Sequence, residues 1–368
     1  MTYVMPDYNK GLVNVASSIL RYFEIEPRHK SLKALDEVLI TNKYQNVVLF
    51  LFDGLGYNLL KDNRDLCPYL YEHLVGKVSS TFPSTTMAAR TTVESGLNPV
   101  EHGWLGWDMY FKEFDDVITL TKNIFKGTNT KAAGYHVAKT LLSYEPVAEK
   151  ISKVPGCHGE TLRVYSNHQE ESLKKMRRKI KEITKNGLKN YVYAYYNEPD
   201  HALHENGARA SEVKRYLKHI NKEFKKTCES LENTLVIAIA DHGHVDVDYV
   251  NIADYPKVSS MLDAKLSIDD RATSFKVKPT YKKAFAHEIK SIIKDDFILM
   301  SKEDVIKHKL YGDGKENKYF RDGLGDYFAI GIGNKAIRYD DTSNQHKSAH
   351  SGLTEDEMFV PLIIVDRK

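Results

Sequence analysis

The strongest constraint on the fold is a set of short, continuously apolar runs that precede acidic residues. Three of them are Asn46–Phe52 (NVVLFLF), Tyr191–Tyr196 (YVYAYY) and Thr234–Ala240 (TLVIAIA). Runs of this kind are typical of parallel strands that are covered on both faces. Because helical segments alternate with these runs, the sequence predicts a wound α/β architecture.

Helical periodicity appears in the chain between the runs. Ala208–Leu231 predicts a helix with one buried face, and Glu170–Thr184 predicts a lysine-rich helix whose charged side we interpret as solvated. The apolar residues of the first helix are Val213, Leu217, Ile220 and Phe224. A further apolar run, Phe359–Val365, predicts a return of the chain to the core.

The region from residue 255 to residue 338 has a different character. It contains short alternating segments, charge clusters and the glycine-rich stretch Tyr311–Gly325. We therefore predict a catalytic α/β domain formed by residues 1–254 and 339–368. Residues 255–338 are predicted to form a smaller inserted or capping subdomain.

Composition excludes several classes of protein. The 368 residues include 53 Lys and Arg against 50 Asp and Glu, a net charge of +3 that does not favour coating of nucleic acid or electrostatic attachment to a membrane. The three cysteines, Cys67, Cys157 and Cys228, lack paired spacing, which indicates a reducing compartment. The apolar runs fall short of the roughly 20 residues of a membrane helix, and the N-terminus lacks a signal-peptide pattern. We expect a cytoplasmic protein.

Acidic and imidazole side chains follow three of the apolar runs. Asp53 follows the first, Asp200 and His204 follow the second, and Asp241 and His242 follow the third. Ligands of open α/β sheets bind at the carboxyl ends of the strands. Mixed carboxylate and imidazole ligands suit zinc, with manganese or iron as alternatives. The pattern predicts a metal site.

A hydroxyl-rich turn opens the segment Ser80–Gly96 (STFPSTTMAARTTVESG), which continues as a predicted helix. For Ser84 and Thr85 we favour a helix-capping role. A hydroxyl at the start of a helix is also suited to act as a metal-activated nucleophile, because the helix end attracts an incoming anion. Residue types alone do not choose Thr81 over its neighbours.

Six short motifs occur along the chain in the order FDG, TFPS, GLNPVEHG, PDHALH, ADHG and HSGLTEDEMFVPLIIV. From about residue 46 to residue 366 they resemble the type I phosphodiesterase/nucleotide pyrophosphatase family of the alkaline phosphatase superfamily. The resemblance implies an alkaline-phosphatase-like three-layer α/β/α sandwich with a mainly parallel central sheet. It also implies a metal-dependent hydrolase that cleaves phosphodiester or phosphoanhydride bonds of a small phosphate ester such as a nucleotide.

The resemblance also implies roles for individual residues. Thr81 matches the nucleophilic threonine, and attack would form a phosphothreonine intermediate there. Two divalent metal ions, zinc or alternatively manganese, would be bound by two sets of residues. The first set is Asp53, Thr81, Asp241 and His242, and the second is Asp200, His204 and His350.

His350 is assigned by its match to the family segment alone. The remaining histidines, which include His102 and His201, are interpreted as structural or supporting residues. His244 and His346 are the first to reconsider, because each lies close to a proposed ligand.

One segment departs from the family pattern. Family members that act on nucleotides often carry an asparagine shortly after the HG dipeptide, whereas this chain has Trp107 and Asp108 near that place. Trp104, Trp107 and Tyr110 would form an aromatic wall for a base or another flat group. A packed aromatic cluster beside the core is the alternative.

Other functions are alternatives to a phosphodiesterase. A phosphomonoesterase or a phosphate-transferring mutase of the same superfamily is the first alternative, although mutases generally carry a serine nucleophile and a large inserted domain. A sulfatase would need a different motif around the nucleophile. A non-catalytic metal-stabilised binding protein is the last alternative, and it would be favoured only by the loss of a ligand.

Overall fold

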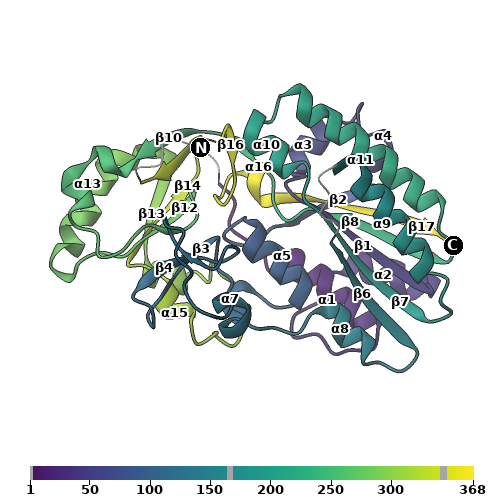
Figure 1. Cartoon of the computed structure of the whole chain (residues 1–368). Coiled ribbons are helices and arrows are strands. Elements are labelled where there is room, and N and C mark those ends of the chain that lie inside the picture. The colour runs from purple at the N-terminus through teal and green to yellow at the C-terminus, as the bar shows by residue number, and fades with distance from the viewer. Residues whose placement is uncertain (1–2, 164–168, 340–345) are drawn as a thin grey trace.

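A six-stranded sheet forms the centre of the protein, with its strands in the order β2-β17-β8-β1-β7-β6. The structure is a computed structural model that describes residues 3–163, 169–339 and 346–368 (Figure 1). Neighbouring strands from β8 to β6 run parallel, and β17 runs antiparallel to both of its neighbours. The strands are β1 (Asn46–Phe52), β2 (Leu74–Ser79), β6 (Cys157–Arg163), β7 (Lys189–Tyr196), β8 (Thr234–Ile239) and β17 (Phe359–Arg367). The mainly parallel sheet predicted from the apolar runs is confirmed.

The central position of β1 explains its unbroken apolar sequence. Every residue of β1 is buried, and the strand is paired on both sides. Leu49, for example, lies opposite Tyr193 of β7 and Ile237 of β8. Side chains on both faces of this strand therefore enter hydrophobic layers.

Helices cover both faces of the sheet (Figure 1). One layer contains α3 (Tyr57–Asp62), α4 (Pro68–Glu72), α9 (Gln169–Ile183), α10 (Asp200–Asn206) and α11 (Ser211–Glu229). The other contains α1 (Leu12–Tyr22), α2 (Lys33–Asn42), α5 (Thr86–Ser95) and α8 (Val147–Ser152). The predicted apolar face of α11 is buried, and the Phe224 ring packs edge-on against Phe50 at a centroid distance of 5.5 Å. The chain therefore has the predicted three-layer arrangement.

A second, seven-stranded antiparallel sheet has the order β13-β14-β12-β11-β3-β4-β5. Its strands are β3 (Asp108–Phe111), β4 (Asp116–Thr119), β5 (Ile124–Phe125), β11 (Ser267–Ile268), β12 (Ala272–Phe275), β13 (Phe297–Ser301) and β14 (Tyr327–Gly331). The subdomain predicted at residues 255–338 is therefore incomplete, because residues 108–125 also belong to this sheet. They join it through the pairing of Asp108 with Ile268. Pairing between segments so far apart in sequence leaves no local signal.

Two small sheets and several short helices complete the described structure. The sheets pair β9 (Val245–Asp246) with β16 (Ser348–Ala349), and β10 (Asp248–Asn251) with β15 (Lys335–Arg338). The remaining helices are α6 (Pro99–His102), α7 (Val137–Leu141), α12 (Pro256–Ser259), α13 (Lys282–Ile293), α14 (Lys302–Lys307), α15 (Phe320–Gly323), α16 (Glu355–Met358), η1 (Ile252–Asp254), η2 (Pro279–Tyr281) and η3 (Lys294–Asp296). Within the described ranges, no helix has both the length and the apolarity to cross a membrane. The three cysteines are free thiols.

Candidate active site

Three adjacent strands deliver the predicted acidic residues to one edge of the central sheet. Asp53 follows β1, Asp241 follows β8, and Asp200 begins α10 after β7. The three strands are parallel neighbours, so their carboxyl ends meet at the same edge. Gly54 has a φ of +74°, and a Cβ there would lie 2.9 Å from the Asp200 Cα. The glycine of the FDG motif therefore allows the two strand ends to approach each other.

A first group of side chains consists of Asp53, Asp241 and His242, all buried. The His242 Nε2 lies 3.4 Å from Asp53 Oδ1 and 3.7 Å from Asp241 Oδ2. The Tyr195 hydroxyl donates a hydrogen bond to the other carboxylate oxygen of Asp53. The structure thus brings together three of the residues that the family resemblance assigns to one metal.

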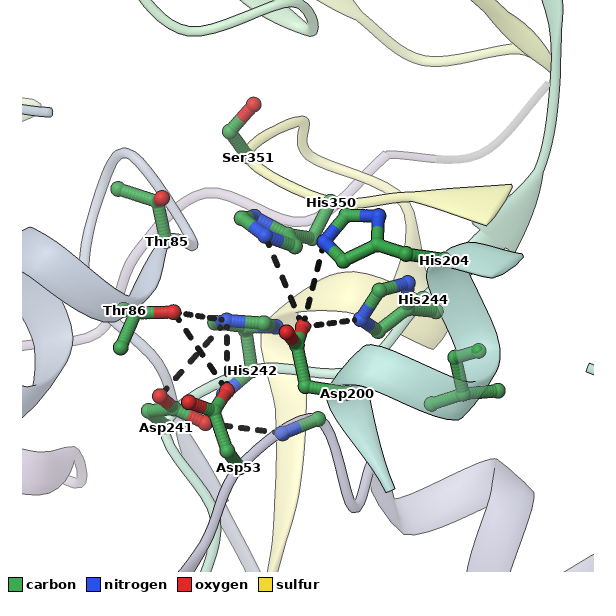
Figure 2. A network of polar contacts seen from close by, with 12 residues as sticks. Asp53, Thr85, Thr86, Asp200, His204, Asp241, His242, His244, His350 and Ser351 are labelled. Atoms are coloured by element: carbon green, nitrogen blue, oxygen red, sulfur yellow. Dashed lines mark hydrogen bonds and ion pairs between the residues drawn. The ribbon is translucent and has the colours of Figure 1, made fainter. Parts of the chain in front are cut away.

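A second group consists of Asp200, His204, His244 and His350 (Figure 2). The Nε2 atoms of the three histidines surround Asp200 Oδ1, with His244 at 2.7 Å, His204 at 3.4 Å and His350 at 3.8 Å. The group contains the three residues expected for the second metal. It also contains His244, which the sequence analysis interpreted as structural or supporting.

The pairing of β9 with β16 explains how distant histidines meet. β9 follows His244 and β16 precedes His350, so this short antiparallel pair holds the two side by side. The Ser348 carbonyl oxygen lies 2.8 Å from His204 Nδ1, and the Ser348 hydroxyl lies 3.0 Å from His244 Nδ1. Because that hydroxyl donates to the Leu203 carbonyl at 2.8 Å, it accepts from His244. One serine therefore orients two of the imidazoles.

The proton positions and unpartnered atoms of the two groups fit a bound cation. In His204 and His242, Nδ1 lies 2.8 Å and 3.1 Å from a backbone carbonyl oxygen, so Nδ1 carries the proton. In the tautomer with its proton on Nδ1, each ring presents the lone pair of Nε2 to a carboxylate oxygen. Among the described residues, the buried Asp241 Oδ2 and His350 Nδ1 have no hydrogen-bond partner. Carboxylate and imidazole donors arranged in this way suit a divalent transition metal.

The electrostatics of the two groups differ. Burial raises the pKa of Asp53 well above its usual range, and the charges of Asp241 and Asp200 raise it further. Burial likewise raises the pKa of Asp241 to about 7. For Asp200, burial is outweighed by the charge of His204 and by the hydrogen bond and charge of His244, which hold its pKa well below the usual value. A cation in the first group would relieve the repulsion between its two carboxylates.

The hydroxyl that contacts the first group belongs to Thr86, the first residue of α5. Thr86 Oγ1 lies 3.1 Å from His242 Nε2 and 3.5 Å from Asp53 Oδ1 (Figure 2). Thr81 Oγ1 instead donates to the Pro83 carbonyl at 2.9 Å, within its own turn. The structure therefore brings Thr86, rather than the predicted Thr81, to the acidic residues.

The hydroxyls expected to cap α5 make other contacts. Thr85 occupies the N-cap position, but its hydroxyl makes no capping bond and donates to Asp269 Oδ2 at 2.7 Å. The Ser84 hydroxyl donates to the Gly352 carbonyl at 2.8 Å. The capping prediction is therefore wrong for both side chains, because each finds a tertiary acceptor. The first backbone N–H groups of α5 remain suited to bind an anion.

Two of the three predicted substrate-binding aromatics are buried in the packing of the second sheet. The Trp104 indole N–H donates to the Leu142 carbonyl at 2.8 Å, and its ring belongs to a hydrophobic core. Tyr110 is also buried, and its hydroxyl donates to Asp115 Oδ1 at 2.6 Å. Trp107 is half-buried against the same core as Trp104. This arrangement corresponds to the packed cluster that was the alternative.

Two residues outside the predicted set, His244 and Thr86, have signals in the sequence. His244 lies two positions after His242 in ADHGHVD, directly after a predicted strand. Thr86 lies in the turn whose hydroxyls were all candidates, and the exact start of a helix is poorly defined by periodicity. Only the position of the first helical turn shows which hydroxyl faces the acidic residues.

Comparison with known proteins identifies the family and agrees with the fold. The sequence matches the family described as type I phosphodiesterase / nucleotide pyrophosphatase over residues 47–321. No curated protein sequence matches the chain significantly.

Among solved structures, murine ectonucleotide pyrophosphatase / phosphodiesterase 5 is similar at 16% identity and a TM-score of 0.62. The human protein of that name has 15% identity and a TM-score of 0.64. An inactive threonine-to-alanine variant of the murine protein, in complex with AMP, has 16% identity and a TM-score of 0.61. Each comparison covers 86% of this chain and 87% of the other. The fold is thus alkaline-phosphatase-like, and the chain belongs to the type I phosphodiesterase / nucleotide pyrophosphatase family of hydrolases.

Proposed function

We propose that the protein hydrolyses phosphodiester or phosphoanhydride bonds of small nucleotide-like substrates through a phosphothreonine intermediate on Thr86. The observation that carries this proposal is the position of the Thr86 hydroxyl. It lies at the N-terminus of α5 and contacts His242 and Asp53 of the first group. In this proposal Thr86 takes the role that the family resemblance implies for Thr81.

The two groups of side chains are proposed to hold two divalent metal ions, most simply zinc, with manganese as the alternative. Asp53, Asp241 and His242 would hold one, and Asp200, His204 and His350 the other. When bound, such ions hold phosphate oxygens and favour the ionised form of a nearby hydroxyl. His244 is close enough to Asp200 to act either as a further ligand or as a support for that carboxylate.

The residues of the chain suggest how the reaction proceeds. The first N–H groups of α5 bind the phosphate, and Thr86 Oγ1 releases its proton to solvent as it attacks phosphorus. As the Oγ1–P bond forms, the bond from phosphorus to the leaving oxygen breaks. Water then attacks the phosphothreonine, which releases the phosphate product and restores the hydroxyl.

Proteins of similar structure support this assignment. The threonine-to-alanine variant of the murine protein is inactive, and its complex contains AMP. Both properties belong to that protein. They favour a threonine nucleophile and a nucleotide-like substrate for this chain.

Substitution of each of the two threonines in turn tests the proposal. With bis-p-nitrophenyl phosphate as substrate, Thr86→Ala should lower kcat by about three orders of magnitude or more, because the attacking oxygen is removed. Thr86→Ser should retain part of the activity. Thr81→Ala should keep most of it, since this hydroxyl only closes its own turn.

Metal content should be measured in each variant, so that loss of the nucleophile is distinguished from loss of the metals. Near-normal turnover by Thr86→Ala together with an inactive Thr81→Ala would contradict the assignment. Rates with mono-p-nitrophenyl phosphate separate a diesterase from a phosphomonoesterase.

A further inference from the structure

A cavity of about 650 Å³ lies next to the start of α5, and its walls come mainly from the second sheet and its loops. Asp269 is part of the wall, and its Oδ2 accepts the hydrogen bond from Thr85, the residue before Thr86. The cavity is within the size range of small-molecule sites. Asp269 therefore links the wall of this cavity to the residue next to Thr86.

Three of the four aspartates in the wall are paired with cations. Asp263 Oδ2 lies 3.8 Å from Lys276 Nζ. Asp108 Oδ2 lies 2.8 Å from Lys126 Nζ, and Asp270 Oδ2 lies 3.0 Å from Arg338 Nε. The guanidinium of Arg338 also lies 4.0 Å above the Tyr249 ring. The charges of these side chains are therefore balanced within the protein.

The fourth aspartate, Asp269, differs from the other three. Its hydrogen bonds come from neutral donors, the Thr85 hydroxyl and the Asp270 backbone N–H at 2.8 Å, and the described residues provide it with no ion pair. Burial and the charge of Asp270 raise its pKa to about 8. A carboxylate that is partly desolvated without a cation costs free energy, and a positively charged ligand group offsets this cost.

We propose that this cavity receives the group attached to the substrate phosphate, and that Asp269 binds an ammonium group on it. The proposal rests on the proposed function, since it places the reacting phosphate at Thr86. It names a substrate class: phosphodiesters or pyrophosphates whose retained group carries a primary amine a few bonds from the phosphate. Asp269 acts in binding and takes no part in bond breaking.

Matched p-nitrophenyl phosphodiesters with a 2-aminoethyl, a 2-hydroxyethyl or a propyl group test this. The purified protein with bound metal should show a kcat/KM for the aminoethyl ester at least about tenfold above that for the propyl ester, as expected for one charge-assisted contact. Asp269→Asn keeps an acceptor for Thr85 and loses the charge, so the ratio should fall toward one. Asp295→Asn removes an exposed carboxylate that does not line the cavity, so the ratio should be unchanged.

The possible outcomes separate this proposal from the proposed function. Equal rates for the three esters, a preference for the hydroxyethyl ester, or a preference that survives in Asp269→Asn would overturn the ammonium site while leaving the phosphodiesterase intact. If none of the esters is hydrolysed, the proposed function fails. The ammonium site is then tested by calorimetry alone, and it requires tighter binding of 2-aminoethyl phosphate than of propyl phosphate. Asp269→Ser replaces the asparagine variant if circular dichroism shows that the latter is misfolded.

Discussion

His244 shows how a single residue can support a site without matching a family motif. Its ring lies between Asp200 and Ser348, with one nitrogen facing each. Burial lowers its pKa to about 3, although the hydrogen bond to Asp200 opposes this shift. The ring is therefore neutral at physiological pH with its proton on Nδ1, so the lone pair of Nε2 faces Asp200 Oδ1 and suits a cation shared with that carboxylate.

Replacing His244 should weaken metal binding. We expect His244→Ala to lower the affinity of the second group by about 10- to 100-fold, the usual cost of losing a residue that orients a ligand. Equilibrium dialysis followed by metal analysis measures this. His201→Ala is the matched control, since His201 is exposed and pairs with Glu205 at 3.4 Å. An equal loss of affinity in both variants would argue against a specific role for His244.

At the scale of elements, the loop between β11 and β12 connects the second sheet to the candidate active site. Arg271 in this loop is fully buried and forms a bidentate ion pair with Glu357, at 2.7 Å and 2.8 Å. Its backbone N–H donates to the Ser351 hydroxyl at 3.2 Å. Ser351 follows His350 and has a φ of +92°, an uncommon conformation for a residue with a side chain. The loop therefore helps to hold the turn that carries a candidate metal ligand.

Breaking the buried pair should destabilise the protein strongly at neutral pH. We expect Glu357→Gln to lower the free energy of unfolding by about 3 kcal/mol, because Arg271 would remain buried without a counter-charge. Burial acts to raise the pKa of Glu357, but the charge and hydrogen bonds of Arg271 outweigh it and hold the pKa below its usual value. Urea unfolding at several pH values measures the difference between wild type and variant.

The pH dependence has a definite sign. A carboxyl whose pKa is lowered on folding stabilises the protein above its unfolded pKa, and this contribution is lost as the pH falls through the folded pKa. The stability difference should therefore be largest at neutral pH and shrink below about pH 4. Glu316→Gln is the control, since it removes a bidentate pair with Arg321 on the surface and should leave stability nearly unchanged. A difference that does not vary with pH would contradict the role of the ion pair.

At the scale of the whole molecule, the candidate metal groups lie where strand ends of the central sheet meet the β9–β16 pair. Their carboxylates are buried close together, so the metal-free protein contains repulsion that bound cations would remove. A ligand that binds only the folded state raises its stability by mass action. Metal binding is therefore expected to contribute to both activity and stability.

Removal of metal tests this at the level of the intact protein. Chelation should abolish turnover and lower Tm, and zinc or manganese should restore both better than magnesium, because imidazole ligands favour transition metals. Scanning calorimetry and a phosphodiesterase assay on the same samples measure the two effects. Full activity in a preparation shown to be metal-free would contradict the metal assignment.

Local sequence patterns by themselves determined the central sheet and its acidic residues. Continuous apolar runs predicted β1, β7 and β8, because a strand buried on both faces needs apolar side chains at successive positions. Asp53, Asp200 and Asp241 were predicted as neighbours because covalent connection places them at strand ends. Family motifs added His350, which no local pattern indicates.

Only the tertiary structure decided which further residues join the site. Thr86 rather than Thr81 contacts the acidic residues because the first turn of α5 sets the direction of each hydroxyl, and sequence periodicity does not define that turn to one residue. His244 joins Asp200 through the pairing of β9 with β16, and residues 108–125 enter the second sheet through β11. Such contacts join segments far apart in the chain, so their free energy depends on packing that no local sequence window contains.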